Sequence, residues 1–210
     1  MSLKGVITGD IVNSRKIMIG HRDLLKKSLE DLNTELSSVT PIRLEMYRGD
    51  SFQVFVENAM KTARIAIMIR AWLKKQTPVG NPPWDARLSI GIGTVEYQAQ
   101  QIIVSDGTAY QRSGFGLDHI GKRRLAVSTG AENVDYELAV STMLLDDVIT
   151  GWTVRQASIM YDYLKEQVSQ KKLAEYLSQS QQNLSKILIA AKADSIDAYV
   201  NRYELLIQQL

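Results

Sequence analysis

The chain has 210 residues, a formal net charge of +2 and 45% hydrophobic residues, enough for one large domain or for a medium domain with a small one. It contains no cysteine and only two histidines, His21 and His119, which excludes disulfides and thiolate metal sites and argues against a zinc site. No window approaches the roughly 18 apolar residues of a membrane span, and no signal-peptide pattern begins the chain, so we expect a cytoplasmic protein without a membrane partner. The small net charge does not by itself indicate a nucleic-acid partner.

The first predicted strand, residues 4–11, carries an acid at its carboxyl end. Asp10 follows an apolar stretch and precedes a polar turn over residues 13–15. Residues 21–39 then place leucines at helical spacing, which predicts an amphipathic helix. Asp10 is therefore expected at an edge of the sheet, where a strand gives way to a loop.

A second acid, Asp50, lies at the tip of a predicted hairpin. Apolar residues alternate with polar ones over residues 42–46 and again over residues 52–56, so each strand has one apolar face. Gly49 supplies the positive φ that a two-residue hairpin loop needs. Ordinary turn chemistry also explains a Gly-Asp pair, but the presence of Asp10 at another strand end favours a site.

The middle of the chain continues the alternation of helices and strands. Residues 59–75 predict a helix, residues 87–95 a strand whose glycines indicate close packing against a helix, and residues 124–128 a further strand. A helix begins near Gly107, and its amino end is a candidate phosphate site. The charged residues of the first of these helices, expected on a solvated face, are Lys61, Arg64, Lys74 and Lys75.

Together these elements predict an α+β fold over residues 1–150, with a ferredoxin-like, mostly antiparallel sheet and helices on one of its faces. The last element of this part is a connecting helix over residues 133–149. The Thr150-Gly151 pair follows it, and we set a domain boundary there.

Residues 151–210 predict an all-α domain with a helix-turn-helix. Short helices are expected over residues 153–165, 170–177, 180–191 and 195–209, and the middle two have the short connection of that motif. Polar and basic residues fall where such a motif contacts base edges and phosphates. The candidate DNA-binding residues are Lys171, Lys172, Gln181, Gln182, Asn183 and Lys186.

A plain helical bundle that packs on the first domain, or on a second copy of the chain, is the alternative for this region. The last helix carries one apolar stripe, which suits a core or a dimer interface. Because the local positive charge is modest, a homodimer that contacts paired half-sites is the expected DNA-binding form. The residues of the stripe are Ile196, Tyr199, Val200, Tyr203, Leu206 and Ile207.

With Asp10 at the end of the first strand and Asp50 at a hairpin tip, the order of elements resembles the catalytic domain of class III nucleotidyl cyclases and their GGDEF relatives. The resemblance implies that these two acids bind Mg²⁺ or Mn²⁺, which take oxygen ligands and bridge nucleotide phosphates. The candidate residues for binding a nucleotide or phosphate are Asn13, Ser14, Arg15, Arg48, Gly107 and Thr108.

Two departures from cyclases argue against turnover. Met46 stands where adenylyl cyclases have a purine-selecting lysine, and the helix after Asp106 lacks the asparagine and arginine, four residues apart, that orient ribose and stabilise the transition state. Gln111 and Arg112 are nearby but do not fit that spacing. We therefore expect cyclase activity to be absent or very slow.

Four motifs taken together also resemble the SatD family, and the resemblance spans nearly the whole chain. It implies a cyclase-like domain joined to a DNA-binding domain. The function expected is that of a DNA-binding transcriptional regulator whose cyclase-like domain either binds a metal-nucleotide or similar phosphate ligand or has decayed into a scaffold. The alternative is a nucleotidyl cyclase or another enzyme acting on nucleoside triphosphates. The motifs occupy residues 9–15, 47–52, 106–110 and 152–156.

Overall fold

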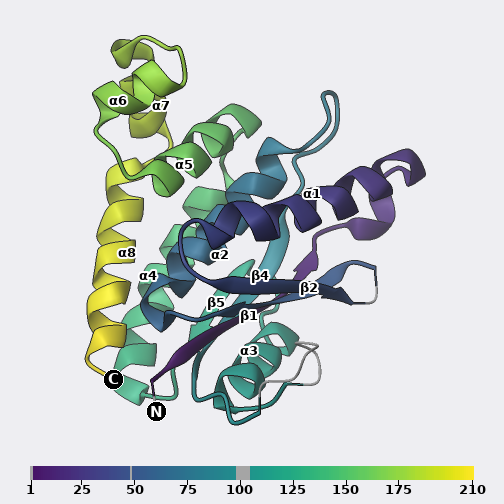
Figure 1. Ribbon diagram of the computed structural model, residues 1–210, viewed down its shortest axis with the longest axis vertical. Coiled ribbons are helices and arrows are strands. Elements are labelled where there is room, and N and C mark those ends of the chain that lie inside the picture. Colours follow the sequence, from purple (N-terminus) through teal and green to yellow (C-terminus); the bar gives the residue numbers. More distant parts are fainter. Residues whose placement is uncertain (1, 48, 98–104) are drawn as a thin grey trace.

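Five strands form one sheet in the order β2-β3-β1-β4-β5 (Figure 1). The computed structural model describes residues 2–47, 49–97 and 105–210. Neighbouring strands are antiparallel except for β4 and β5, which are parallel. The strands are β1 (Lys4–Ile11), β2 (Ile42–Tyr47), β3 (Ser51–Val56), β4 (Ala86–Gly93) and β5 (Leu125–Ser128).

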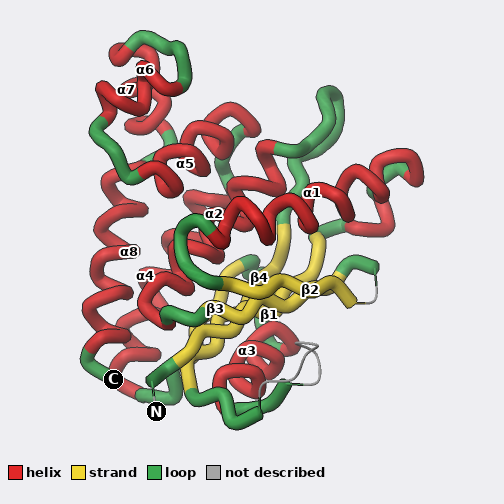
Figure 2. The backbone as a smooth tube through the Cα atoms, in the orientation of Figure 1, coloured by secondary structure: helices red, strands yellow, loops and turns green. Residues whose placement is uncertain are grey.

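Helices cover both faces of this sheet (Figure 2). Helices α1 (Ile19–Ser37) and α2 (Thr62–Lys75) pack on the face that receives Ile7, whereas α3 (Thr108–Asp118) packs on the face that receives Thr8. The alternation of β1 side chains produces this division, because successive residues point to opposite faces. The α+β class is confirmed, with the correction that α3 lies on the face we expected to be uncovered.

The glycines of β4 allow α3 to approach closely, as the sequence predicted. A Cβ atom at Gly91 would lie 2.1 Å from the carbonyl oxygen of Ala109 in α3, a distance that no real Cβ contact tolerates. Beside this contact, the hydroxyls of Thr8 and Ser113 are 2.8 Å apart and link β1 to the same helix. Close backbone packing is therefore the reason for glycine here.

The charged face of α2 is not solvated, which corrects the sequence prediction. Lys74 and Arg64 are buried, while Lys61 and Lys75 are partly covered. A third layer of helices covers this face: α4 (Glu132–Thr150), α5 (Val154–Glu166) and α8 (Ala193–Gln208). The added layer supplies acids for these cations, with Lys61 Nζ 3.0 Å from Glu204 and Lys75 Nζ 3.0 Å from Asp162.

Helices α6 (Gln170–Tyr176) and α7 (Gln181–Ala190) stand at one end of the molecule, away from the sheet (Figure 1). By contrast, α5 and α8 belong to the main core. Trp72 of α2 meets Tyr161 of α5 with ring centroids 5.0 Å apart, and the hydroxyl of Tyr203 in α8 donates to the Ala59 carbonyl at 3.4 Å. A separate domain over residues 151–210 stays a prediction, since one hydrophobic cluster runs through both parts.

A buried ionic network fastens the helical layer to the sheet. The guanidinium of Arg70 in α2 makes two 2.8 Å contacts with Asp85, just before β4, and one of 2.7 Å with Asp146 in α4. Lys74 and Arg124 also reach Asp85, at 3.3 and 2.8 Å. Burial alone would raise the pKa of the Asp85 carboxyl, but these cations outweigh it and lower that pKa to about 2.

Among the described residues, no helix is long and apolar enough to cross a bilayer.

Asp85 should make the protein sensitive to acid. Its pKa falls from 3.8 in the unfolded chain to about 2 in the fold, so its contribution is present above pH 4 and is lost as the pH falls toward 2. By linkage the contribution is roughly 2 kcal/mol. Urea unfolding at several pH values should show this loss for the wild type and a flatter profile for Asp85→Asn.

At neutral pH, Asp85→Asn should reduce the free energy of unfolding by about 3–5 kcal/mol, because buried cations lose their counterion. The Asp31→Asn variant, which removes an exposed acid from α1, is the control and should unfold like the wild type. If Asp85→Asn has the stability and acid profile of the control, the network does not hold the layers together.

Candidate functional site

The two acids singled out by the sequence lie on neighbouring strand ends. Asp10 is the cross-strand partner of Ser51, and the Ile11 amide donates to the Asp50 carbonyl at 2.9 Å. Tyr47 pairs with Ser51 across the hairpin, so the two strands are not joined by the expected two-residue loop, and Gly49 has the expected positive φ of 78°. This hairpin geometry places the Asp50 backbone against the end of β1.

The side chain of Asp10 binds a guanidinium. Arg87, its cross-strand partner on β4, approaches with Nε 2.9 Å from Oδ1 and with its terminal nitrogen on Oδ2. The hydrogen bond to Asp10 raises the pKa of Arg87. Both side chains are partly exposed, Asp10 at 22% and Arg87 at 41%, so a metal ion and solvent can compete for this carboxylate.

The side chain of Asp50 accepts a hydrogen bond from Ser14 Oγ at 2.6 Å. This contact links the loop after β1 to the β2–β3 hairpin, and so it fixes the segment that follows Asp10 against the segment that carries Asp50. In the same loop Asn13 and Arg15 are exposed. Arg48, the other hairpin residue predicted to bind phosphate, lies outside the described residues.

The chemistry of this acid pair suits a hard divalent cation. Carboxylate oxygens are the ligands that Mg²⁺ and Mn²⁺ prefer, and Mg²⁺ usually takes one or two of them together with water and substrate phosphates. Within the described ranges no cluster of three or more acidic, histidine or cysteine side chains is present. Asp10 and Asp50 could therefore supply only part of a coordination shell, and metal binding stays a prediction.

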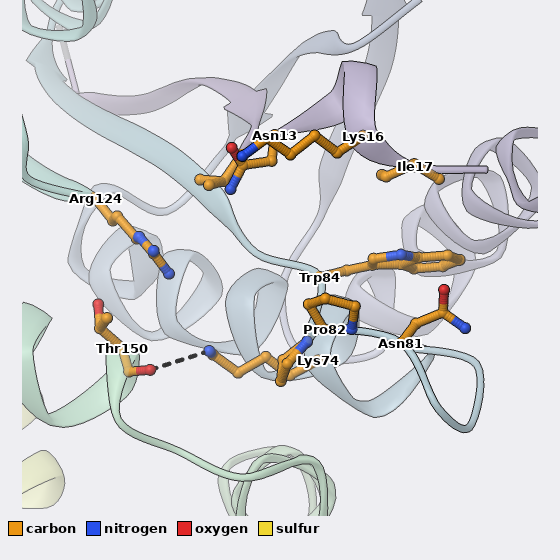
Figure 3. Close-up of a pocket in the computed structure, with 11 residues that line it drawn as sticks. Asn13, Lys16, Ile17, Lys74, Asn81, Pro82, Trp84, Arg124 and Thr150 are labelled. Atoms are coloured by element: carbon orange, nitrogen blue, oxygen red, sulfur yellow. Dashed lines mark hydrogen bonds between the residues drawn. The ribbon is translucent and has the colours of Figure 1, made fainter.

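A cavity of about 390 Å³ opens at the same edge of the sheet, beside the loop after β1. Figure 3 shows Lys16 and Asn13 on one side of it, with Lys74 and Arg124 on other sides. Among the described residues, Lys74 Nζ contacts two acceptors, Asp85 and the Thr150 carbonyl, each at 3.3 Å. Burial lowers the pKa of this ammonium, and Asp85 offsets the effect only in part.

Sequence reasoning placed Asn13 near phosphate but missed the rest of this cavity. The sequence predicts Lys74 on a solvated helix face, and Lys16 and Arg124 are not among the residues predicted to bind phosphate. The three cations are separated by long stretches of chain, and no local spacing signals that they converge. A tryptophan after the proline-rich stretch of residues 78–83 is the one unusual sequence feature nearby.

Gly107 and Thr108 do not lie near Asp10 and Asp50. The hydroxyl oxygen of Thr108 accepts a hydrogen bond from the Thr94 amide at 2.9 Å. Thr94 directly follows β4, at the end of that strand that pairs with the start of β1. Six residues of β1 separate that end from Asp10, which is roughly 20 Å at the usual strand rise. The structure therefore divides the predicted phosphate-binding residues between opposite edges of the sheet.

Helices α6 and α7 have the expected helix-turn-helix packing. Leu173 and Ala174 of α6 are buried, as are Leu184 and Leu188 of α7. The serines before the two helices cap them: Ser169 accepts from the Lys172 amide at 3.4 Å and Ser180 from the Asn183 amide at 3.2 Å. Local capping and apolar contact thus explain why two such short helices form.

Most of the predicted DNA-binding residues lie on the exposed surface of this pair of helices. Asn183 is the exception: it is half-buried, and its side-chain amide donates to Gln179 at 3.0 Å, which fixes its orientation. The exposed residues are Lys171, Lys172, Gln181, Gln182 and Lys186.

The apolar stripe of α8 forms part of the core of the chain itself. Tyr203 is fully buried, and Tyr199 is buried with its hydroxyl 2.7 Å from that of Thr142 in α4. This stripe is therefore not a surface for a second copy, and homodimer formation stays a prediction. Helix α4 has exposed apolar residues instead: Tyr136, Val140 and Leu144.

The model of the SatD family matches residues 5–206 of this chain. A comparison with curated protein sequences found no match.

Solved structures that resemble the chain include the active GGEEF domain of a diguanylate cyclase from Vibrio cholerae. It is 20% identical, covers 60% of this chain and 83% of its own, and has a TM-score of 0.44. Two structures of a bacterial light-regulated adenylyl cyclase have TM-scores of 0.40 and 0.38. The first is 16% identical, and the alignment covers 60% of this chain and 43% of the cyclase chain. The second is 14% identical, and the alignment covers 65% of this chain and 80% of the cyclase chain. Similarity at this level gives no information about activity.

If Arg87 competes with a metal ion for Asp10, Arg87→Ala should bind Mn²⁺ more tightly than the wild type. A partly exposed ion pair contributes up to about 1 kcal/mol, so the gain should be a few-fold. Titration calorimetry measures it directly, and Arg155→Ala, an exposed arginine outside the site, should have no effect. Unchanged or weaker Mn²⁺ binding by Arg87→Ala would make the Asp10–Arg87 pair purely structural.

Proposed function

This chain belongs to the SatD family, and we propose that its sheet domain binds a nucleoside polyphosphate together with Mg²⁺ or Mn²⁺. One observation carries the proposal: the Ile11 amide bonds to the Asp50 carbonyl at 2.9 Å, so two acid-bearing strand ends lie together at one sheet edge. The sequence resemblance to nucleotidyl cyclases implies metal binding by the same two acids, Asp10 and Asp50.

Binding is favoured over rapid turnover. In the resting protein Asp10 is neutralised by Arg87 rather than left open for catalysis. Arg112, the only arginine of α3, donates to the carbonyl of Ile92 and lies against Gly130. An arginine used in this way is not available to stabilise charge on a transferring phosphoryl group.

The experiment is titration calorimetry with ATP and with GTP, each in Mn²⁺ and in EDTA. We expect binding that requires the metal and that Asp50→Asn weakens roughly tenfold or more, since even outer-shell partners of a metal are worth that much. Asp31→Asn, which removes an exposed acid from α1, is the control. Equal nucleotide binding by Asp50→Asn, or binding that ignores the metal, would contradict the proposal.

The same preparations decide between a sensor and an enzyme. Cyclic product formed from ATP or GTP at about one turnover per second or faster, and abolished in Asp50→Asn, would identify the chain as an enzyme acting on nucleoside triphosphates. Nucleotide binding without product would support a ligand-binding role.

A second candidate function, DNA binding, is favoured by the position of α6 and α7. These helices stand clear of the sheet, and their exposed surface carries Lys171 and Lys172 on one helix and Gln181 and Gln182 on the next. Glutamine can pair with adenine edges, while lysine reaches phosphates. Together with the first proposal, this describes a regulator whose DNA binding responds to a nucleotide. A dimer through the exposed apolar face of α4 would present two such surfaces.

Selection from a random duplex pool, followed by binding of the enriched sequence at several salt concentrations, tests this function. Gln182→Ala should cost about 1–3 kcal/mol on the selected sequence and little on random duplex, because a base contact carries the discrimination. The Lys171→Ala, Lys172→Ala double variant should weaken binding to every sequence and reduce the salt slope by roughly two.

The matched control is Lys26→Ala, Lys27→Ala, an adjacent pair of exposed lysines on α1. If no sequence is enriched and both lysine pairs behave alike, α6 and α7 serve packing or assembly instead.

A further inference from the structure

We propose that the cavity between the loop after β1, the end of α2 and the start of β5 binds the phosphate group of a small molecule without a metal ion. The cavity is lined by Lys16, Lys74, Arg124 and Asn81, with Trp84 as one wall (Figure 3). Its volume of about 390 Å³ lies within the range of small-ligand sites, roughly 300–1,000 Å³. Neither Asp10 nor Asp50 is among the residues that line this cavity.

The charges around the cavity favour an anion. In the buried network beneath it, three cations (Arg70, Lys74 and Arg124) face two carboxylates (Asp85 and Asp146), which leaves an excess of one positive charge. Lys16 adds a second positive charge at the rim. In the part of the chain that the structure describes, none of the salt bridges involves it. Two excess positive charges match a phosphate group, which carries close to two negative charges near neutral pH.

Lys74 is the cation most in need of this partner. Its side chain is only 2% exposed, and both of its acceptors lie at 3.3 Å, whereas charge-assisted bonds are usually about 2.7–2.9 Å. A buried ammonium with long contacts still has hydrogen-bonding capacity that an anion in the cavity can use. Asn13 also lines the cavity and offers an uncharged side-chain donor, whereas the amide of Asn81 already donates to the carbonyls of Pro78 and Val79 at 3.4 Å.

The remaining walls indicate what the phosphate is attached to. Ile17 and Pro82 line the cavity together with Trp84, so part of its surface is apolar. Free phosphate would leave this surface in contact with water, whereas a ring or chain esterified to the phosphate would cover it. The expected ligand is therefore a phosphate monoester with a compact apolar or aromatic body.

The test compares three probes by titration calorimetry in EDTA at constant ionic strength: phenyl phosphate, inorganic phosphate and benzoate. We expect phenyl phosphate to bind most tightly, inorganic phosphate more weakly, and benzoate least, because it has the ring but only one negative charge. Lys16→Ala should weaken phenyl phosphate roughly tenfold, the effect of losing one charge-assisted contact. Lys16 is exposed, so this variant should fold normally.

Lys27→Ala provides the control, since it removes an exposed lysine of α1 that does not line the cavity. It should bind phenyl phosphate like the wild type. The proposal is overturned if neither phosphate probe binds, if benzoate binds as well as phenyl phosphate, or if Lys16→Ala and Lys27→Ala are indistinguishable. EDTA removes the metal on which the proposed nucleotide binding depends, so either idea can fail while the other stands.

Discussion

The guanidinium of Arg70 connects three parts of the chain that are distant in sequence: α2, the start of β4 and α4. Its side chain is completely buried, and Asp85 and Asp146 accept its hydrogen bonds at 2.7–2.8 Å. A buried charge is tolerated only when its counterions are correctly placed, and removing one partner leaves the other uncompensated. The helical layer can therefore pack on the sheet in only a narrow range of positions. The geometry of the cavity and of the junction between α4 and α5 follows from this constraint.

The same network explains why a cationic cavity occurs at this edge of the sheet. Asp85 accepts two hydrogen bonds from Arg70 and also contacts Lys74 and Arg124. One carboxylate cannot neutralise the charges of three cations. Thr150, the last residue of α4, accepts a hydrogen bond from Lys74 through its carbonyl group. The chain continues from there through Trp152 into α5 and the helix-turn-helix. A ligand that binds Lys74 would therefore contact a residue bonded to the junction between the sheet domain and the carboxyl-terminal helices.

Asp10 and Asp50 lie on adjacent backbone segments, but each side chain is bonded to another residue of the protein. The end of β1 and the hairpin lie side by side, which is the arrangement that the resemblance to cyclases implied. The side chains are engaged within the protein, Asp10 with Arg87 and Asp50 with Ser14. A guanidinium beside a carboxylate stabilises it in the absence of metal and must be displaced when a cation binds. The pairing of Asp10 with Arg87 is one reason why we propose ligand binding, rather than rapid turnover, for this site.

The sequence by itself determined the local structure, because alternation in the strands, helical spacing of leucines and the glycine of the hairpin act over a few residues. It also identified the helix-turn-helix, whose caps and apolar contacts are local. Only the tertiary structure decided that Asp10 pairs with Arg87, that Gly107 lies at the opposite edge from Asp50, and that Lys74 faces a cavity. The first two depend on the register and direction of β4 beside β1, which link residues far apart in the chain. The third depends on a layer of helices that buries a face of α2 whose charged residues, taken alone, are typical of a solvated surface.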